Sequence, residues 1–97
     1  MIPYIPQPVR AEDIMIPREL YALSERIAQN THEVWSAGRI ADGWIWGPVR
    51  DDVQRKHPCL ISYEDLSEEE KEYDRRTSME TIKLILALGY EIRIPEQ

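Results

Sequence analysis

Side chains that suit one buried helix face recur every three or four residues along the first half of the chain. Pro17 stands where the first turn of a helix would begin, and Asp42-Gly43 stand where the helix would end. Between them, the positions on this face are Leu20, Leu23, Ile27, Thr31, Val34 and Gly38. Their spacing predicts a single helix from residue 17 to about residue 41.

Two helix starts follow each other in the C-terminal third of the chain. Ser67 has Glu70 three residues further on, and Thr77 has Glu80 at the same distance. In such a capping box, the hydroxyl and the carboxylate bond to free backbone N–H groups at the start of a helix. The sequence therefore predicts a short acidic helix, a kink or break near Arg76 and a second helix.

The second of these helices has apolar side chains around much of its circumference. One stripe consists of Met79, Ile82, Ile85 and Leu86. Leu84 and Leu88 lie on another side of the helix. This distribution is typical of a helix covered on several sides, so we expect a central helix that ends at Gly89.

Two short segments are predicted to form strands. Residues 44–46 place two tryptophans around Ile45 between Gly43 and Gly47, and residues 90–94 alternate apolar and charged side chains before Pro95. We expect these two segments to pair. The predicted fold class is mainly α: a small helical domain of a long N-terminal helix and two C-terminal helices, with short β segments near 44–46 and 90–94.

Residues 1–16 contain three prolines and are predicted to form an extended N-terminal arm. Its apolar side chains are expected to lie across the core, and they are Ile2, Tyr4, Ile5 and Val9. Residues 17–97 are predicted to be one domain, because a chain of 97 residues leaves no room for a second.

Charge and composition narrow the classes of partner. A net charge of -6 repels phosphate groups, which disfavours nucleic acid and anionic membranes as partners. No apolar stretch approaches the ~20 residues of a membrane span, and the N-terminus does not have the pattern of a signal peptide. The single cysteine, Cys59, excludes an intramolecular disulfide, so we expect a cytoplasmic location.

Several segments combine glycine, aromatic, histidine and charged residues at defined spacings. They are Asn30-x-His32-x-x-Trp35-x-x-x-Arg39-x-x-x-Gly43-Trp44-x-x-Gly47, Arg50-Asp51-Asp52, His57-Pro58-x-Leu60-x-x-Tyr63-x-x-Leu66, Glu70-Lys71-x-x-Asp74-Arg75 and Leu86-x-Leu88-Gly89-Tyr90. Together they resemble the ryanodine receptor repeat, and the resemblance covers the chain from about Pro3 to Ile94.

The resemblance implies a mainly helical fold with short strands, no enzymatic activity and no cofactor. In the animal calcium-release channels, such repeats form tandem pairs on the cytosolic periphery and serve as interaction and regulatory modules. This chain has one repeat and lacks the inter-repeat loop with kinase sites, so channel regulation does not carry over. A lone repeat could recover the approximate two-fold of the tandem pair by binding a second copy, so we expect a homodimer or another protein partner.

Five residues of the first helix lie along one flank of it: Tyr21, Ala28, His32, Trp35 and Arg39. They could line a pocket in which the guanidinium of Arg39 holds a carboxylate or a phosphate. In the alternative interpretation Trp35 packs in the core, while carboxylates such as Asp74 or Asp52 satisfy His32 and Arg39.

Trp44 and Trp46 are the second candidate feature. Because the chain has no phenylalanine, a core anchor is the simplest role for Trp44. If the segment is extended, both indoles share a face and are either both buried or both exposed. In the exposed case they would form a platform, with Arg39, Arg50 and His32, for a small anionic or nucleotide-like ligand.

The segment Arg50-Asp51-Asp52 is a further candidate for ligand binding. Its mixed charges, followed by Arg55 and Lys56, more simply indicate salt bridges that fix the loop to helix ends. Two adjacent aspartates provide too few ligands for calcium or magnesium, so we predict no metal site.

Cys59 would be the nucleophile if the chain were an enzyme, with His32 or His57 as its base. The thiol lies in an apolar Cys-Leu-Ile run, which favours a packing role, so we predict no catalytic residue.

The run Arg75-Arg76-Thr77-Ser78 matches the pattern that basophilic kinases prefer. The predicted capping role of Thr77 favours a structural explanation instead.

Overall fold

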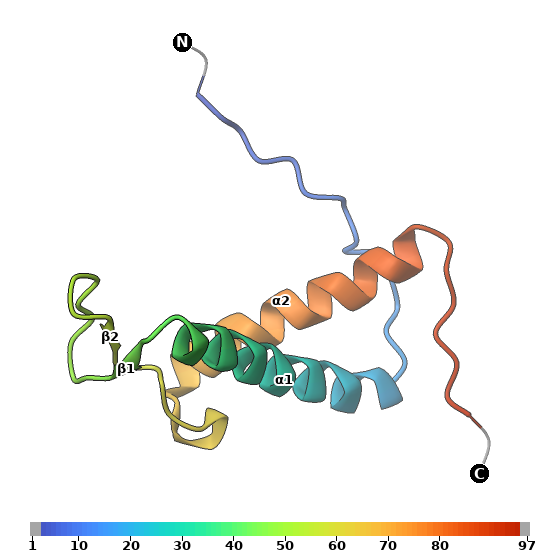
Figure 1. Ribbon diagram of the computed structural model, residues 1–97. Helices are drawn as coiled ribbons and strands as arrows, with labels where there is room; N and C mark the ends of the chain where they lie inside the picture. The colour runs from blue at the N-terminus through green and yellow to red at the C-terminus, as the bar shows by residue number, and fades with distance from the viewer. Residues whose placement is uncertain (1–2, 96–97) are drawn as a thin grey trace.

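The computed structural model describes residues 3–95, and it confirms the mainly helical fold. Figure 1 shows two long helices that lie against each other and cross obliquely, with two very short strands beyond one end of the pair. In chain order the elements are α1 (Glu19–Ala41), β1 (Ile45–Trp46), β2 (Lys56–His57), the 3-10 turn η1 (Tyr63–Asp65) and α2 (Glu68–Ala87). Within the described residues, neither helix combines the length and the apolar character needed to cross a membrane.

Helix α1 begins and ends close to its predicted bounds, but its buried face differs from the prediction. The buried residues are Leu20, Ser24, Ala28 and His32, spaced by four. Val34, which belonged to the predicted stripe, is 64% exposed. The small side chains of Ser24 and Ala28 permit a close approach of the chain packed against α1, so the buried face is centred on them rather than on the largest apolar residues.

Helix α2 is continuous, so the predicted break near Arg76 is wrong. Ser67 does cap its N-terminus, because the Ser67 hydroxyl accepts a hydrogen bond from the Glu70 N–H. Thr77 is not a cap: it lies inside the helix, and its hydroxyl donates to the carbonyl of Tyr73 at 3.0 Å. The same local motif is compatible with a helix interior when the flanking residues pack on one continuous face.

Ser78, the second hydroxyl of the kinase-type pattern, is buried. Its Oγ donates to the carbonyl of Asp74 at 2.7 Å. In this fold a kinase therefore has no access to Ser78, whereas Thr77 is exposed.

The strands pair with each other and not with the C-terminal segment. Ile45 lies opposite Lys56 in a parallel pair, and a Cβ atom at Gly47 would come within 2.7 Å of the Lys56 Cβ, which explains the glycine. The predicted strand at 90–94 is wrong, since these residues form no strand after the chain leaves α2 through Gly89 at φ 92°. The nearer segment, β2, is hydrogen-bonded to β1 in its place.

The two tryptophans do not share an environment, contrary to the expectation from an extended segment. Trp44 is 9% exposed and Trp46 is 54% exposed. Trp44 precedes β1 and still belongs to the turn that ends α1, because its N–H donates to the carbonyl of Arg39 at 2.9 Å. The alternation of a strand therefore does not extend to Trp44.

The buried apolar cluster lies where η1 and the residue after it meet α1. Ala28 of α1, Tyr63 of η1 and Leu66 form a buried cluster, and Cys59 packs against it. This cluster holds the segment between β2 and α2 against α1.

An ion-pair network next to this core connects three elements. The Arg75 guanidinium on α2 donates to both carboxylate oxygens of Glu25 on α1, at 2.7 and 3.3 Å. The Tyr63 hydroxyl of η1 donates to Glu25 at 3.2 Å, and Arg75 also reaches Glu68 at 3.2 Å. The sequence analysis did not predict this connection.

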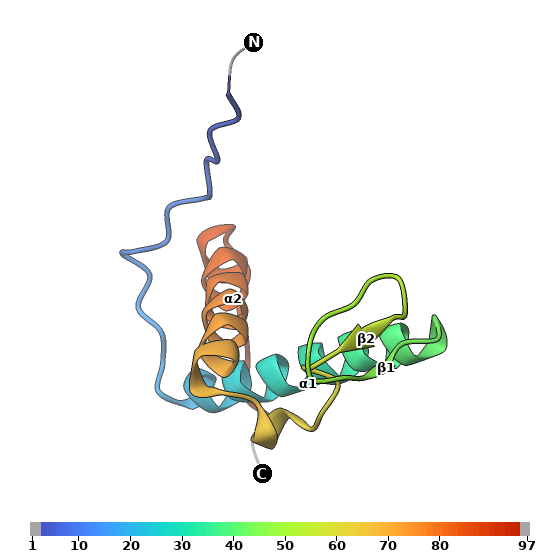
Figure 2. The same ribbon diagram turned by 90° about the vertical axis from the view of Figure 1, so that its left-hand side faces the viewer.

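The N-terminal arm does not cover the core, contrary to expectation. It leads away from the end of α2 in both ribbon views (Figures 1 and 2). Tyr4 is 86% exposed, and Ile5 and Val9 are exposed as well. Ala11 at the base of the arm is buried, and residues 6–12 line an open hollow together with Arg76, Glu80 and Lys83 of α2, whereas Ile2 lies outside the described residues.

Candidate functional site

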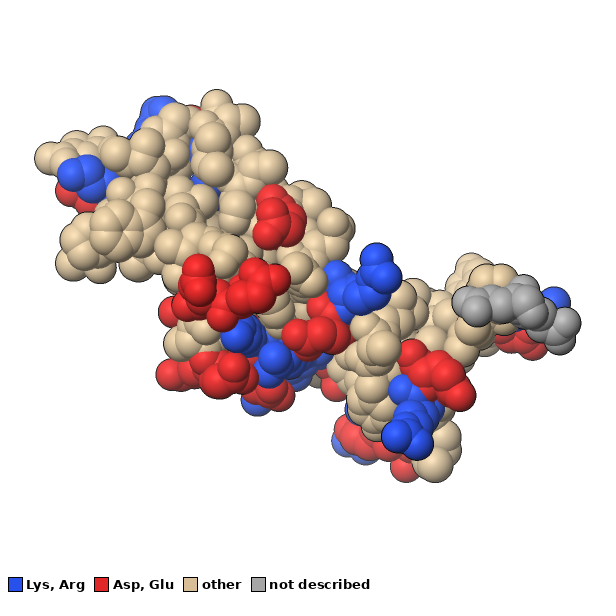
Figure 3. Space-filling view, turned by 90° about the horizontal axis from the view of Figure 1, so that it is seen from below, with Lys and Arg blue, Asp and Glu red and all other residues tan. Residues whose placement is uncertain are grey.

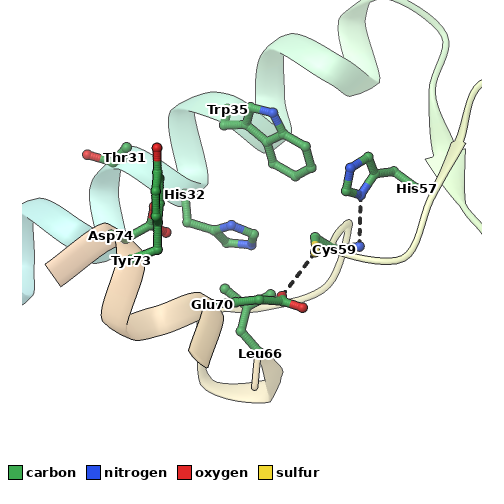
Figure 4. A pocket seen from close by; sticks show the side chains of 9 residues that line it. All are labelled: Thr31, His32, Trp35, His57, Cys59, Leu66, Glu70, Tyr73 and Asp74. Atoms are coloured by element: carbon green, nitrogen blue, oxygen red, sulfur yellow. Dashed lines mark hydrogen bonds between the residues drawn. The ribbon is translucent and has the colours of Figure 1, made fainter. Parts of the chain in front are cut away.

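A pocket of about 420 Å³ lies between the two helices, within the range of small-molecule sites. One side comes from α1, the opposite side comes from α2, and β2 with the segment after it closes one end (Figure 4). The lining residues are Thr31, His32, Trp35, His57, Cys59, Leu66, Glu70, Tyr73 and Asp74.

His32 and Trp35 form the α1 side of this pocket. His32 is 5% exposed, and its Nε2 lies 2.7 Å from the carbonyl oxygen of Ile61. A carbonyl can only accept, so Nε2 bears the hydrogen. The His32 ring stacks on the Trp35 indole at a centroid distance of 5.7 Å, which fixes both rings.

His57 and Cys59 close one end of the pocket. The Cys59 N–H donates to His57 Nδ1 at 3.0 Å, and the His57 ring meets the edge of Trp35 at 4.9 Å. Burial lowers the pKa of His57, and the charges of Arg50 and Arg39 add to the effect. The neutral imidazole is therefore the favoured form at neutral pH.

The Cys59 thiol is protonated in this setting. It donates to Glu70 Oε2 at 3.0 Å, and burial together with this bond raises its pKa to about 11. A nucleophilic cysteine needs the opposite shift. The environment of Cys59 thus opposes thiol catalysis, in line with its apolar sequence context.

Glu70 and Asp74 form the acidic side of the pocket, one helical turn apart on α2. Burial raises the pKa of Asp74, and Glu70 raises it further, although His32 acts in the other direction. Across residues 3–95, no lysine or arginine forms an ion pair with either carboxylate. This side of the pocket therefore has negative charge without a fixed counter-ion.

Arg39 and Trp44 lie next to the pocket but do not line it. The Arg39 guanidinium sits 5.6 Å from the centre of the Trp35 ring and 4.7 Å from that of Trp44. The alternative interpretation expected carboxylates to bind His32 and Arg39, and it is wrong about these partners. His32 binds the carbonyl of Ile61, and the Arg39 guanidinium lies over two indole rings.

The other sequence candidates lie on the strand pair and its connecting turn, outside the pocket lining. Arg50 and exposed Asp52 form an ion pair at 2.8 Å, which lowers the pKa of Asp52. Asp51 Oδ1 accepts from the N–H groups of Val53 and Gln54 and so shapes the turn. The expected attachment of the loop to a helix end comes from Arg55, whose guanidinium donates to the carbonyl of Asp42 at 2.6 Å.

The candidate site thus divides into two groups. His32 and Trp35 meet in the pocket, with Arg39 and Trp44 adjacent, whereas Trp46, Arg50, Asp51 and Asp52 lie apart. Of the pocket residues contributed by α2, only Asp74 was expected from the sequence to lie near His32, whereas Glu70 and Tyr73 were not predicted. The signal for the two acids was the spacing of four between Glu70 and Asp74, which places both on one face of a helix.

A comparison with models of known protein families gives a match to the RyR domain over residues 4–94. The match spans nearly the whole chain and includes every segment on which the resemblance to the ryanodine receptor repeat rested.

Proposed function

This chain belongs to the RyR domain family, and from that premise we propose that it is a non-enzymatic interaction or regulatory module that presents a surface to a protein partner. The raised pKa of Cys59 supports the absence of thiol chemistry. The single cysteine and the acidic composition support a cytoplasmic location.

The observation that most directly supports this proposal is the exposed apolar arm. Tyr4, Ile5 and Val9 are 86%, 68% and 56% exposed in a proline-containing segment. A second exposed apolar group, Ile45 and Trp46, lies on β1 at the other end of the helix pair. Figure 3 shows charged side chains concentrated over the middle of one face, with a broad tan region at one end.

The surface area indicates how much a partner could cover. The chain exposes 8191 Å², whereas a compact monomer of 11.4 kDa exposes roughly 5,800 Å². The radius of gyration of 16.9 Å likewise exceeds the value of about 12–13 Å for a compact domain of this length. The excess area is larger than the ~800 Å² that each partner buries in a standard interface.

We assign the partner as a second copy of this chain, which gives a homodimer. Two-fold pairing is the commonest closed assembly of soluble chains, and the exposed apolar side chains of the arm are accessible to a neighbour. A heterologous protein partner is the alternative outcome.

Light scattering during size exclusion at about 10–100 µM tests this assignment, because a stable pair has a dissociation constant below that range. We expect a mass near twice the single-chain value of 11.4 kDa. A mass equal to the single-chain value across the whole concentration range would exclude the homodimer.

A second candidate function is ligand sensing, which the pocket of about 420 Å³ favours. The sequence analysis expected a small anionic or nucleotide-like ligand. In this pocket a bare anion would meet Glu70 and Asp74, while Arg39 and Arg50 lie outside the lining. The ligand class is therefore the point that requires a separate test.

A further inference from the structure

The polar lining of the pocket between α1 and α2 contains carboxylates without counter-charge. Glu70 and Asp74 both line it. The neighbouring cations on α2, Lys71 and Arg75, bind carboxylates outside the pocket. Lys71 and Arg75 are thus paired elsewhere, while the pocket acids, within the described residues, have no cation bound to them.

Asp74 is the more confined of the two acids. It is half-buried, and burial is the main cause that raises its pKa. A carboxylate that has lost part of its hydration gains more from a bound cation than an exposed one does, because the attraction is less screened.

His32 is an independent polar feature of the same cavity. Its side chain is more than nine-tenths buried, and Nε2 donates to the Ile61 carbonyl. In the neutral ring Nδ1 is then an acceptor, and it has no hydrogen-bond partner within residues 3–95. Figure 4 shows this ring directed into the space between Trp35 and Glu70.

Apolar groups complete the cavity. The Trp35 indole and the Leu66 side chain line it, and the exposed Tyr73 stands at its rim. The cavity therefore combines a wall for a short alkyl chain with acceptors for a group that only donates hydrogen bonds. Guanidinium and primary ammonium groups are donors without acceptor atoms.

We propose that this pocket binds an organic cation, namely a guanidinium or primary ammonium group on a short alkyl chain, through Asp74 and Glu70. The alkyl part lies against Trp35, and the acceptors of the pocket take up the donors of the cation. The cation comes either from a free small molecule or from an arginine or lysine side chain of a partner. This proposal specifies the ligand class of the sensing function and does not depend on the homodimer.

The test is a titration of the isotopically labelled full chain followed by amide and indole NMR signals. One arm uses propylguanidinium and the other uses the peptide acetyl-Gly-Arg-Gly-amide, with the citrulline peptide as the neutral control of the same shape. We expect shifts at His32, Trp35 and Asp74 with a dissociation constant on the order of 1 mM for so small a ligand. The arm that binds more tightly identifies the source of the cation.

Charge-neutral variants give the second part of the test. Asp74→Asn and Glu70→Gln should each weaken binding about tenfold or more, whereas Glu80→Gln, an exposed acid of α2 outside the pocket, should not. Glu70 is exposed, so its variant remains informative if Asp74→Asn proves unstable.

Three results would overturn the proposal: no shift at the pocket residues, equal binding of the citrulline peptide, or unchanged binding by Glu70→Gln. A parallel titration with phosphate, acetate and adenosine monophosphate distinguishes failure of the cation site from failure of the ligand-sensing function. Pocket shifts with these anions alone would retain ligand sensing and refute the cation site.

Discussion

At the scale of single residues, Trp44 is the buried tryptophan, and it lies between the C-terminal end of α1 and the pocket residue His57. Trp44 lies under the Arg39 guanidinium and beside His57, at a centroid distance of 6.2 Å from that ring. Trp46 stands two residues further along and is half-exposed on β1. Burial, rather than residue type, therefore separates the expected roles of the two side chains.

Trp44→Ala is expected to cost about 3–5 kcal/mol of unfolding free energy, because it removes a large buried side chain and leaves a cavity. The matched Trp46→Ala variant should cost about 1 kcal/mol or less, since much of its surface already contacts water. Urea denaturation followed by circular dichroism measures both values. Equal losses from the two variants would contradict the burial that separates them.

At the scale of elements, the Glu25–Arg75 pair fixes α1 to α2. The hydrogen bond from Arg75 is the main cause that holds the pKa of Glu25 below its ordinary value of 4.5. A carboxyl with a depressed pKa in the folded state binds fewer protons there than in the unfolded chain. Its stabilising contribution is therefore complete above about pH 4.5 and is lost as the pH falls through the folded-state pKa.

Arg75→Gln should remove this contribution, so the stabilities of the variant and the parent should converge as the pH falls from about 6 to about 3. The neighbouring Arg76→Gln is the control, because Arg76 is exposed and forms no ion pair within residues 3–95. Thermal unfolding across this pH range measures the difference. A constant gap between parent and Arg75→Gln would show that the pair does not control the acid response.

The elements also show which parts of the structure the sequence could predict. Pro17 and Asp42-Gly43 are local signals, and α1 follows them closely. Thr77 bears a local signal of the same kind, yet packing keeps α2 continuous through it. The strand partner of residues 45–46 and the acids that face His32 depend on contacts between distant segments, which no local pattern contains.

At the scale of the whole molecule, the fold has two distinct outer features. The pocket lies inside the crossing of α1 and α2, whereas the arm leaves the far end of the helix pair (Figure 2). The proposed partner surface on the arm and the proposed ligand pocket are therefore separate. Each can be removed by substitution without direct change to the other.

The arm gives the last prediction, which concerns how the proposed homodimer is held. Replacing Tyr4, Ile5 and Val9 by serine should shift the assembly to monomer, because these exposed apolar side chains are the ones placed to bury surface on a neighbour. The melting temperature of the diluted, monomeric chain should stay nearly unchanged, since these side chains are more than half exposed in the single chain. Light scattering during size exclusion measures the mass, and Gln7→Ser, in the same exposed segment, is the control. If the triple variant stays dimeric, the interface lies elsewhere, and the exposed apolar residues of β1 become the next surface to substitute.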